Sequence, residues 1–348
     1  MNHVNHLRNT AYVSIILGSV IALLILGRIV FLPFVIAIFV WLIIRSIRNY
    51  LLKIKLVKKF VANWVLSIVA TLIIFFIIFI VGSLLLQNIG QISEQLPSYE
   101  ENVNNFIQSF SGYFGLSQVK DLNELASNID FNSYFAGILN SFSGFMSTFL
   151  MVLIYVLFLL LEEKSLGVKF NKLFFRKDKR EQAENISLKL SESVEEYIFI
   201  KTVVSLLAAF LSYLILIYFN IDFAFFWAFL IYITSYIPNI GAFIGMIFPA
   251  LFSVLQTSSI QTLVILLVVL GVIQFVTGSV LEPKWMGRSM NLSTVVVLLS
   301  LAVWGSIWGI IGMILSVPLT MVISIVLAQF PQTEKVSMIL SEKGQVPK

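Results

Sequence analysis

Long apolar runs separated by short charged segments form the pattern along the chain. A helix needs about 20 apolar residues to cross the hydrocarbon core of a bilayer. The runs close to that length are residues 11–27, 29–44, 61–86, 142–161, 198–219 and 260–281. We predict each of these runs to be a membrane helix. Arg28 alone separates the first two runs, which predicts a tight helical hairpin near the membrane surface.

Two further apolar stretches, residues 223–255 and 292–330, are too long for one span and are interrupted near their middle. The interruptions are SYIPNIGAFIG and WGSIWGIIGMILSVP, in which glycine and proline disfavour a continuous helix. At membrane depth, irregular backbone is tolerated only where it is buried in protein or lines a cavity. We therefore expect two Gly/Pro-broken helical hairpins, both candidates for re-entrant segments. The whole pattern predicts an all-α polytopic membrane protein with about eight membrane segments.

The distribution of Lys and Arg orients these helices. Segment 45–60 has six basic residues and no acidic residue, and segment 162–197 has eight basic residues. Segment 87–141 has six acidic residues against Lys120 alone. Since cytoplasmic loops are enriched in Lys and Arg, we expect the first two segments inside, the third outside, and both chain termini in the cytoplasm.

Two of the polar segments have helical periodicity. In the outer segment, apolar residues recur at helical spacing and Ser98 with Glu101 matches a capping box. The inner segment has Ile186, Leu190 and Val194 on one stripe, and its basic cluster is expected to contact anionic membrane lipid. The predicted organisation is three spans in residues 1–86, an extracytoplasmic amphipathic helical insert in 87–141, a fourth span in 142–161, a cytoplasmic amphipathic helix in 162–197, a core with the two broken hairpins in 198–330 and a cytoplasmic tail in 331–348.

Composition narrows the class of protein. Of the 348 residues, 59% are hydrophobic and 12% are charged, whereas a water-soluble domain has about 25% charged residues. There is no cysteine and there are two histidines, which excludes a disulfide scaffold and a zinc ribbon. The metalloprotease HExxH and nucleotide-binding P-loop patterns are absent from the sequence. We expect no enzyme, no cofactor, no metal site and, despite the net charge of +5, no nucleic-acid partner.

The two interrupted stretches share a short repeat, because IGMI at 244–247 recurs at 311–314. By the charge argument one stretch enters the membrane from outside and the other from inside, which predicts an inverted repeat. Such repeats with interrupted helices are the plan of many secondary transporters, with the solute site near the midplane. The predicted residues for binding and gating a small polar solute are Pro238, Asn239, Gly241 and Gly245 on one side and Gly305, Ser306, Gly309, Gly312 and Pro318 on the other. The alternative is that these glycines serve only close helix packing.

Few charges lie in the apolar part of the chain. Between residues 198 and 332 they are Lys201, Asp222, Glu282, Lys284 and Arg288. Ionisable groups inside a membrane domain are costly and are functional candidates. Glu282 is a candidate ligand for a proton or a sodium ion, and the alternative is a structural clamp with Lys284 or Arg288. Lys201 forms one charge cluster with Glu282, Lys284 and Arg288 unless its side chain snorkels to the cytoplasmic surface.

Four segments carry a family resemblance: YIFIKTVVS at 197–205, YIPNIGAFIG at 236–245, LEPKWMGRSMNLSTVVVLLSLAVWG at 281–305 and GIIGMILSVPLT at 309–320. Together they resemble the autoinducer-2 exporter family of bacterial inner-membrane proteins, the PerM-like permeases. The resemblance implies about eight membrane segments, an outer helical insert, a homo-oligomer such as a pentamer, and autoinducer-2 as cargo. Some relatives are instead assigned as sodium or lithium/proton antiporters.

The family motif falls on particular positions of this chain. They are Pro238, Asn239, Gly241, Glu282, Pro283, Gly287, Arg288, Gly309, Gly312 and Pro318. One departure is visible, since Glu195, Glu196 and Ile200 stand where many relatives have glycines. The leading hypothesis is a secondary exporter of a small polar metabolite, driven by an ion gradient or by the gradient of the solute. The alternatives are a cation/proton antiporter that uses Glu282, and a non-transporting scaffold of the cell envelope.

Overall fold

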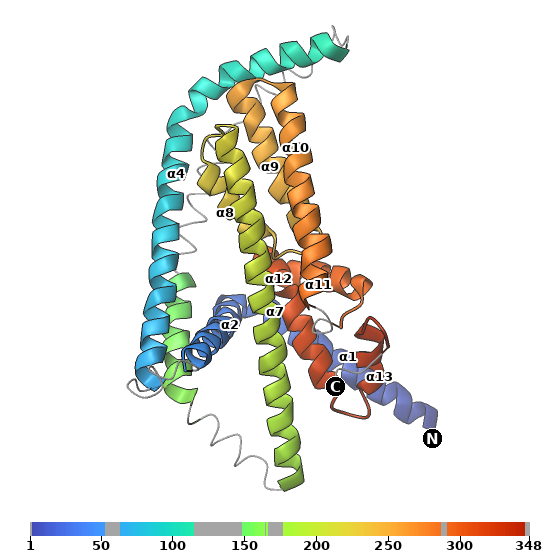
Figure 1. The fold of residues 1–348 in the computed structure, drawn as a ribbon. Helices are drawn as coiled ribbons and strands as arrows, with labels where there is room; N and C mark the ends of the chain where they lie inside the picture. Colours follow the sequence, from blue (N-terminus) through green and yellow to red (C-terminus); the bar gives the residue numbers. More distant parts are fainter. Residues whose placement is uncertain are drawn as a thin grey trace. The chain divides into compact units, whose positions relative to one another are not determined.

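Every regular element in the described part of the chain is helical, which confirms the all-α fold class (Figure 1). The computed structural model describes residues 2–52, 63–114, 148–163, 165, 177–286 and 291–344. Residues 148–163 are helical. The other elements are α1 (Asn2–Leu26), α2 (Arg28–Leu51), α4 (Asn63–Phe114), α7 (Lys177–Tyr218), α8 (Ala224–Thr234), α9 (Ile240–Thr257), α10 (Ile260–Phe275), the π-helix η1 (Val276–Leu281), α11 (Glu282–Met286), α12 (Thr294–Leu327) and α13 (Glu334–Leu340).

Six of the described helices are long and apolar enough to cross a membrane. They are Arg28–Asn49, Trp64–Asn88, Leu188–Tyr218, Ile240–Thr257, Ile260–Met286 and Thr294–Leu327. Two shorter apolar helices, Ala11–Leu26 and Ala224–Thr234, add to them. Helix 148–163 covers most of the predicted fourth span, whose residues 142–147 lie outside the described ranges. The chain is therefore a multi-pass membrane protein, and the count of eight membrane segments stays a prediction.

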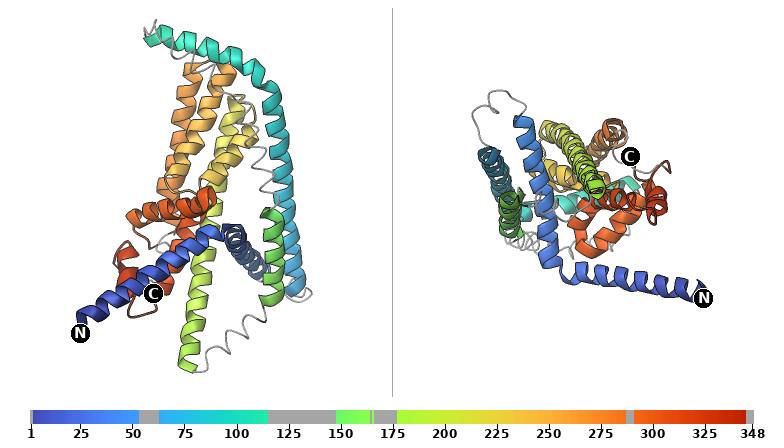
Figure 2. Two further views of the ribbon diagram at one scale, coloured as in Figure 1. Left: turned by 180° about the vertical axis from the view of Figure 1, so that it is seen from behind. Right: turned by 90° about the horizontal axis from the view of Figure 1, so that it is seen from below.

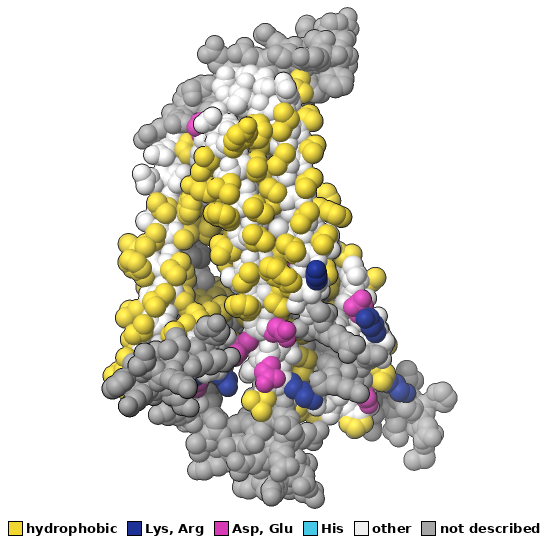
Figure 3. All heavy atoms as spheres, in the orientation of Figure 1, with side chains coloured by type: hydrophobic (Ala, Val, Ile, Leu, Met, Phe, Trp, Pro, Cys, Tyr) yellow, Lys and Arg dark blue, Asp and Glu magenta, His cyan; other side chains and the backbone are white. Residues whose placement is uncertain are grey.

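The outward faces of these helices are apolar, as contact with lipid requires. On α10, Val264, Val268, Val272 and Phe275 are exposed at intervals of about one turn. Figure 3 shows hydrophobic side chains spread over most of the described surface on the face that it presents. The described helices therefore present a largely apolar surface on this face.

Two compact units make up the chain. Unit 1 contains Met1–Phe60, Ser147–Glu195 and Asn291–Lys348, and unit 2 contains Val61–Met146 and Glu196–Met290. Each unit holds one of the two interrupted apolar stretches.

In unit 1, the first two helices do not form the expected tight hairpin. Gly27, the residue between α1 and α2, donates its N–H to the Leu23 carbonyl (2.8 Å) and accepts from the Phe31 N–H (2.9 Å). These bonds keep helical spacing through the junction, so a single residue bends the chain without reversing it. Figure 2 shows α1 leaving α2 at an angle rather than running alongside it. A Cβ on Gly27 would lie 2.7 Å from the Phe31 ring, so glycine permits this close bend.

Unit 1 is held together by contacts between segments far apart in sequence. Arg48, near the end of α2, donates to both carboxylate oxygens of Glu163 at 2.7 and 2.5 Å. Such a bidentate pair fixes orientation as well as distance. Farther along the same two helices, the rings of Phe34 and Tyr155 meet edge to face. α2 and helix 148–163 are thus joined at two levels.

Four helices supply the core of unit 2. Leu216 of α7, Trp227 of α8, Phe252 of α9, and Leu266 and Leu270 of α10 pack in one buried cluster. In lipid, such a core is stabilised by van der Waals packing rather than by removal of apolar surface from water. The hairpin α8–α9 is therefore seated directly against α7 and α10.

The helix α4 extends far beyond its membrane span. Its 52 residues correspond to about 78 Å of helix, more than twice the hydrocarbon thickness. The expected insert 87–141 thus begins as a direct continuation of span three. Figure 1 shows a bend in α4, and the sequence of this helix contains Pro97, a residue type at which helices kink. The side chains of Ser98 and Glu101, which match the capping box, lie outside the described part of the chain, and so do residues 115–141.

A pair of hydrogen bonds anchors the outer arm of α4 (residues 97–114) within unit 2. Asn102 Nδ2 donates to the Gln256 carbonyl (3.2 Å), and the Ser258 hydroxyl donates to the Asn102 carbonyl (3.0 Å). The arm is thereby attached to the turn between α9 and α10.

We expect the substitution Asn102→Leu to loosen this arm, because it removes the donor to Gln256. Hydrogen–deuterium exchange in residues 97–114 should rise severalfold, while exchange in the span Trp64–Asn88 stays the same. The control Asn88→Leu removes a hydrogen bond that stays within α4, from Asn88 Nδ2 to the Leu84 carbonyl, and should leave the arm unchanged. Equal exchange in the Asn102 variant and the wild type would show that this contact does not hold the arm.

Candidate functional site

The first interrupted stretch folds as a helical hairpin, with α8 packed on α9 and a sharp tip between them. Asn239 forms the corner with φ 60° and ψ −54°, and the Ile240 N–H donates to the Pro238 carbonyl (2.6 Å), which is the geometry of a γ-turn. Thr234 and Ser235 end α8 by donating their hydroxyls to carbonyls of the preceding turn. The Asn239 side chain is exposed and makes no capping bond. The tip therefore presents a free amide.

Two buried glycines let this hairpin pack closely. A Cβ on Gly241 would lie 1.7 Å from the Thr234 carbonyl oxygen. A Cβ on Gly245 would lie 3.0 Å from Nε2 of Gln274 on α10 and 3.3 Å from Cγ1 of Ile231 on α8. Close helix packing, the alternative that the sequence left open, is thus the role that the geometry gives to both glycines.

The second interrupted stretch is also a hairpin, because α12 is broken at Gly309, where φ is 65° and ψ is −145°. Trp304 Nε1 donates to Thr320 Oγ1 at 3.3 Å, although these residues are 16 positions apart and a straight helix would separate them by about 24 Å. A Cβ on Gly312 would lie 2.0 Å from the Trp304 carbonyl oxygen. The chain therefore folds back at Gly309, in a backbone conformation that glycine adopts without a steric penalty.

The remaining predicted residues of this hairpin differ in exposure. Gly305 faces the side chain of Met313, which would lie 3.0 Å from a Cβ at position 305. Ser306 is exposed and donates its hydroxyl to a carbonyl of its own helix (2.8 Å). Pro318 is buried in the second half of α12. Among the predicted residues, those that the structure leaves exposed at the two hairpins are Asn239, Ser306 and Gly309.

The two hairpins correspond feature by feature. Asn239 and Gly309 both have positive φ at a tip. Gly241 and Gly312 both lie against a carbonyl of the preceding helix. In this comparison Gly312 corresponds to Gly241 and not to Gly245, with which the IGMI repeat pairs it. The hairpins belong to different units, so the inverted repeat and a meeting of the two tips stay predictions.

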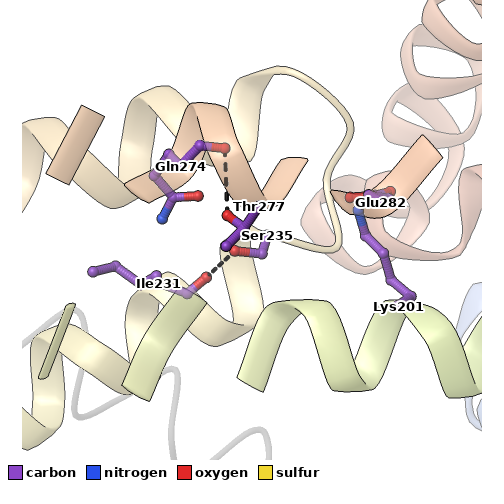
Figure 4. Close-up of polar contacts among 6 residues, drawn as sticks. All are labelled: Lys201, Ile231, Ser235, Gln274, Thr277 and Glu282. Carbon is purple, nitrogen blue, oxygen red and sulfur yellow. Dashed lines mark hydrogen bonds and ion pairs between the residues drawn. The ribbon is translucent and has the colours of Figure 1, made fainter. Parts of the chain in front are cut away.

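An ion pair lies inside unit 2. Lys201 Nζ of α7 is 2.5 Å from Oε1 of Glu282 of α11, and the Lys201 side chain is 4% exposed (Figure 4). Lys201 therefore does not snorkel to the surface. The partner of Glu282 is this lysine rather than Lys284, which is exposed, and Arg288 lies outside the described residues.

Side-chain hydroxyls form a second polar group on α7 and on α8 with its tip. Tyr236 OH is 2.8 Å from Thr202 Oγ1 and 3.2 Å from Tyr232 OH. Tyr197, on the same helix as Thr202, is buried. Sequence reasoning missed these tyrosines. The spacing of four residues between Tyr232 and Tyr236, at the start of the first interruption, is the signal that could have found them.

A third polar feature, also missed, lies on α10. Gln274 is 5% exposed, and its Nε2 has no hydrogen-bond partner among the described residues. Two residues after it the helix widens into η1, where the Thr277 hydroxyl donates to the Ile273 carbonyl (2.7 Å). Single π-helical turns occur frequently at functional sites. The available signal was a lone amide within the apolar run 263–276.

Comparison with known proteins matches residues 12–332 to the family described as AI-2E family transporter. The AI-2 transport protein TqsA of Escherichia coli K12 is 28% identical over 90% of this chain and 90% of its own length. A putative transport protein of Haemophilus influenzae is 28% identical over 89% of both chains. The putative transport protein YhhT of Escherichia coli K12 is 29% identical over 60% of this chain and 58% of its own length. The match to the family runs through both hairpins and the ion pair.

We expect Gly241→Ala and Gly312→Ala each to destabilise its hairpin, because the new methyl group would lie 1.7 or 2.0 Å from a backbone oxygen. Overpacking of this kind costs about 1–3 kcal/mol, so the melting temperature of the purified protein in detergent should fall by about 5 °C. The control is Gly278→Ala, since a Cβ there meets nothing within 4 Å and alanine favours the helix. Equal melting temperatures for all three variants would contradict the packing role.

We expect Lys201→Met to lower the melting temperature more than the double variant K201M/E282L does. Removing one partner of a buried ion pair costs about 3–5 kcal/mol because the other charge is left unpaired, whereas the double variant leaves no charge. Lys284→Met is the control, because that side chain is exposed, and its melting temperature should equal that of the wild type. A double variant that melts lower than Lys201→Met would show that the two charges are not coupled.

Proposed function

Because the chain belongs to the AI-2E family of transporters, we propose that it is a secondary transporter that exports a small polar metabolite such as autoinducer-2. The observation that carries the proposal is the pair of hairpins whose tips leave helical geometry at Asn239 and Gly309. The name of the relative TqsA, AI-2 transport protein, supports this choice of cargo.

The hairpins act in this proposal as the moving gate. α8 has 11 residues and is about 16 Å long, roughly half of what a membrane crossing needs. A helix this short fits a re-entrant segment that turns back at Asn239. Helix ends leave N–H and C=O groups without partners in their own helix, and these groups offer hydrogen bonds to a polar solute. The exposed amide of Asn239 adds a donor and an acceptor at the same place.

The proposed location is the inner membrane of a bacterium, with both termini in the cytoplasm. The excess of Lys and Arg in segments 45–60 and 162–197 supports this orientation. A homo-oligomer, such as the pentamer that the resemblance implies, belongs to the same proposal. The sequence has no P-loop, so the transport step draws on a solute or ion gradient.

Two alternatives have less support. Sodium or lithium/proton antiport would need Glu282 as a free carboxylate, but Lys201 holds that carboxylate at 2.5 Å. A non-transporting scaffold would depend on the loops, whereas the matching family is described as transporters.

The proposal is tested by flux of autoinducer-2 into proteoliposomes, with and without a sodium or proton gradient. We expect Asn239→Ala and Gly309→Leu each to reduce the initial rate at least tenfold, because one removes the tip amide and the other blocks the positive φ of the turn. The same assay on Glu282→Gln measures sodium-dependent proton movement, and its loss together with unchanged autoinducer-2 flux would favour antiport.

Two matched controls separate the gate from general effects of these substitutions. Asn220→Ala replaces another exposed asparagine of positive φ, and Gly344→Leu replaces another glycine of positive φ, both away from the hairpin tips. Both controls should transport at the wild-type rate. Full activity of the Asn239 and Gly309 variants would contradict the gate.

A further inference from the structure

Besides Trp227, three polar side chains in unit 2 have a buried polar atom without a hydrogen-bond partner among the described residues. They are Gln274, which is 5% exposed, Ser205, which is 1% exposed, and Ser212, which is fully buried. Buried polar groups in native proteins are nearly always paired, and each exception requires an explanation. Serine in a helix usually bonds to a carbonyl of the preceding turn, as Ser253 of α9 does with Ala250, but neither of these two α7 serines does so.

The two serines lie on one face of α7. Lys201, Ser205, Ala208, Ser212 and Leu216 are all buried, and they recur every three or four residues, so they form a single stripe. The stripe is small and polar at its middle. It therefore leaves room against α7 where a larger side chain from another helix, or a solute, fits.

Ile231 of α8 occupies this room. It is fully buried and packs on Ala208 and Ala209 of α7. From the other side Gln274 reaches toward it from α10, as Figure 4 shows, and both Gln274 Nε2 and Ile231 Cγ1 lie within 3.3 Å of the position that a Cβ of Gly245 would take. Ile231 thus packs on Ala208, which lies between the two serines along the α7 stripe, and the unpaired amide of Gln274 approaches it from the other side.

The ends of α8 are suited to movement. Phe223, its N-terminal cap, has φ 57° and ψ 32°, a left-handed conformation that is strained for a bulky residue. Asn239 turns the chain after its other end, also with positive φ. α10 widens into η1 two residues after Gln274. Strained or irregular backbone therefore lies at both ends of α8 and close to Gln274 on α10.

We propose that Gln274, Ser205 and Ser212 form a hydrogen-bonding subsite for a small neutral solute with several hydroxyl or carbonyl oxygens, and that Ile231 fills this subsite when no solute is bound. The inference rests on the proposed function and deepens it by naming the residues and the chemical class of the solute. When α8 moves, Ile231 leaves the subsite, and the oxygen atoms of the solute accept hydrogen bonds from the unpaired N–H and O–H groups. A neutral solute is favoured because the neighbouring charges, Lys201 and Glu282, already neutralise each other.

The test compares stability with solute affinity in Gln274→Met and in the double variant S205A/S212A. Because these variants remove unpaired polar groups, they should melt at the same temperature as the wild type or higher. The KM for autoinducer-2 flux should nevertheless rise about tenfold, which is the usual effect of losing one or two hydrogen bonds to a ligand. A merely structural role would not combine higher stability with weaker transport.

Two controls carry the same chemical changes at paired residues. Gln256 accepts from the Asp222 N–H and donates to the Asn220 carbonyl, and Ser253 donates to the Ala250 carbonyl. Gln256→Met and Ser253→Ala should melt lower than the wild type and keep its KM.

A binding measurement distinguishes failure of this subsite from failure of the proposed function. Dihydroxypentanedione, the neutral precursor of autoinducer-2, should raise the melting temperature of the detergent-purified protein, and glycerate, a carboxylate of similar size, should not. Gln274→Met should abolish the shift. A Gln274-dependent shift without flux would reject export and retain the subsite. An unchanged KM in a folded Gln274→Met protein, or no shift in the wild type, would overturn the subsite.

Discussion

Backbone N–H and C=O groups must be satisfied inside the protein wherever the chain crosses hydrocarbon, because no water is present to pair with them. This constraint explains why every regular element of the described chain is helical. It also makes the departures from helical geometry informative. At Asn239 a local γ-turn recovers one backbone bond, and Thr234 and Ser235 bond to carbonyls of the preceding turn. At Gly309 the chain folds back in a conformation suited to glycine.

Close approach of helices follows from the same setting. Lipid tails are as apolar as a protein core, so helices associate in a membrane through van der Waals contact and hydrogen bonds. Gly241 and Gly312 provide this contact at the hairpins, where any side chain would strike a carbonyl oxygen. Ala208 and Ala209 provide it where α7 meets α8. The same packing rule therefore explains two features. The hairpin α8–α9 packs tightly, and the face of α7 that it contacts has small side chains.

Polar groups in the core divide into satisfied and unsatisfied sets. Lys201 and Glu282 neutralise each other, and Tyr236 shares hydrogen bonds with two other hydroxyls. Such groups stabilise one arrangement of the helices. Gln274 and Ser205 have no partner among the described residues, so their arrangement is one that a suitable ligand improves. A transporter needs both kinds of group, since it must hold a frame and also bind and release a solute.

Local chemistry was enough to predict the helices and their interruptions. The apolar runs, the two Gly/Pro breaks and the charge of each loop are properties of neighbouring residues, and these predicted an all-α membrane protein with two helical hairpins. The expected hairpin of α1 and α2 was wrong, because the hydrogen bonds of Gly27 keep the helical spacing and bend the chain without reversing it.

What only the tertiary structure decided is which distant residues meet. Lys201 and Glu282 are 81 positions apart, and the sequence favoured the nearer Lys284 or Arg288 as the partner. No neighbour in sequence distinguishes Gln274 from another polar residue in a span, whereas the fold places it beside Gly245 and Ile231. The sequence by itself determined where helices form and end, because those choices depend on local backbone bonding. Pairing and burial depend on how the helices pack, and no local pattern records that.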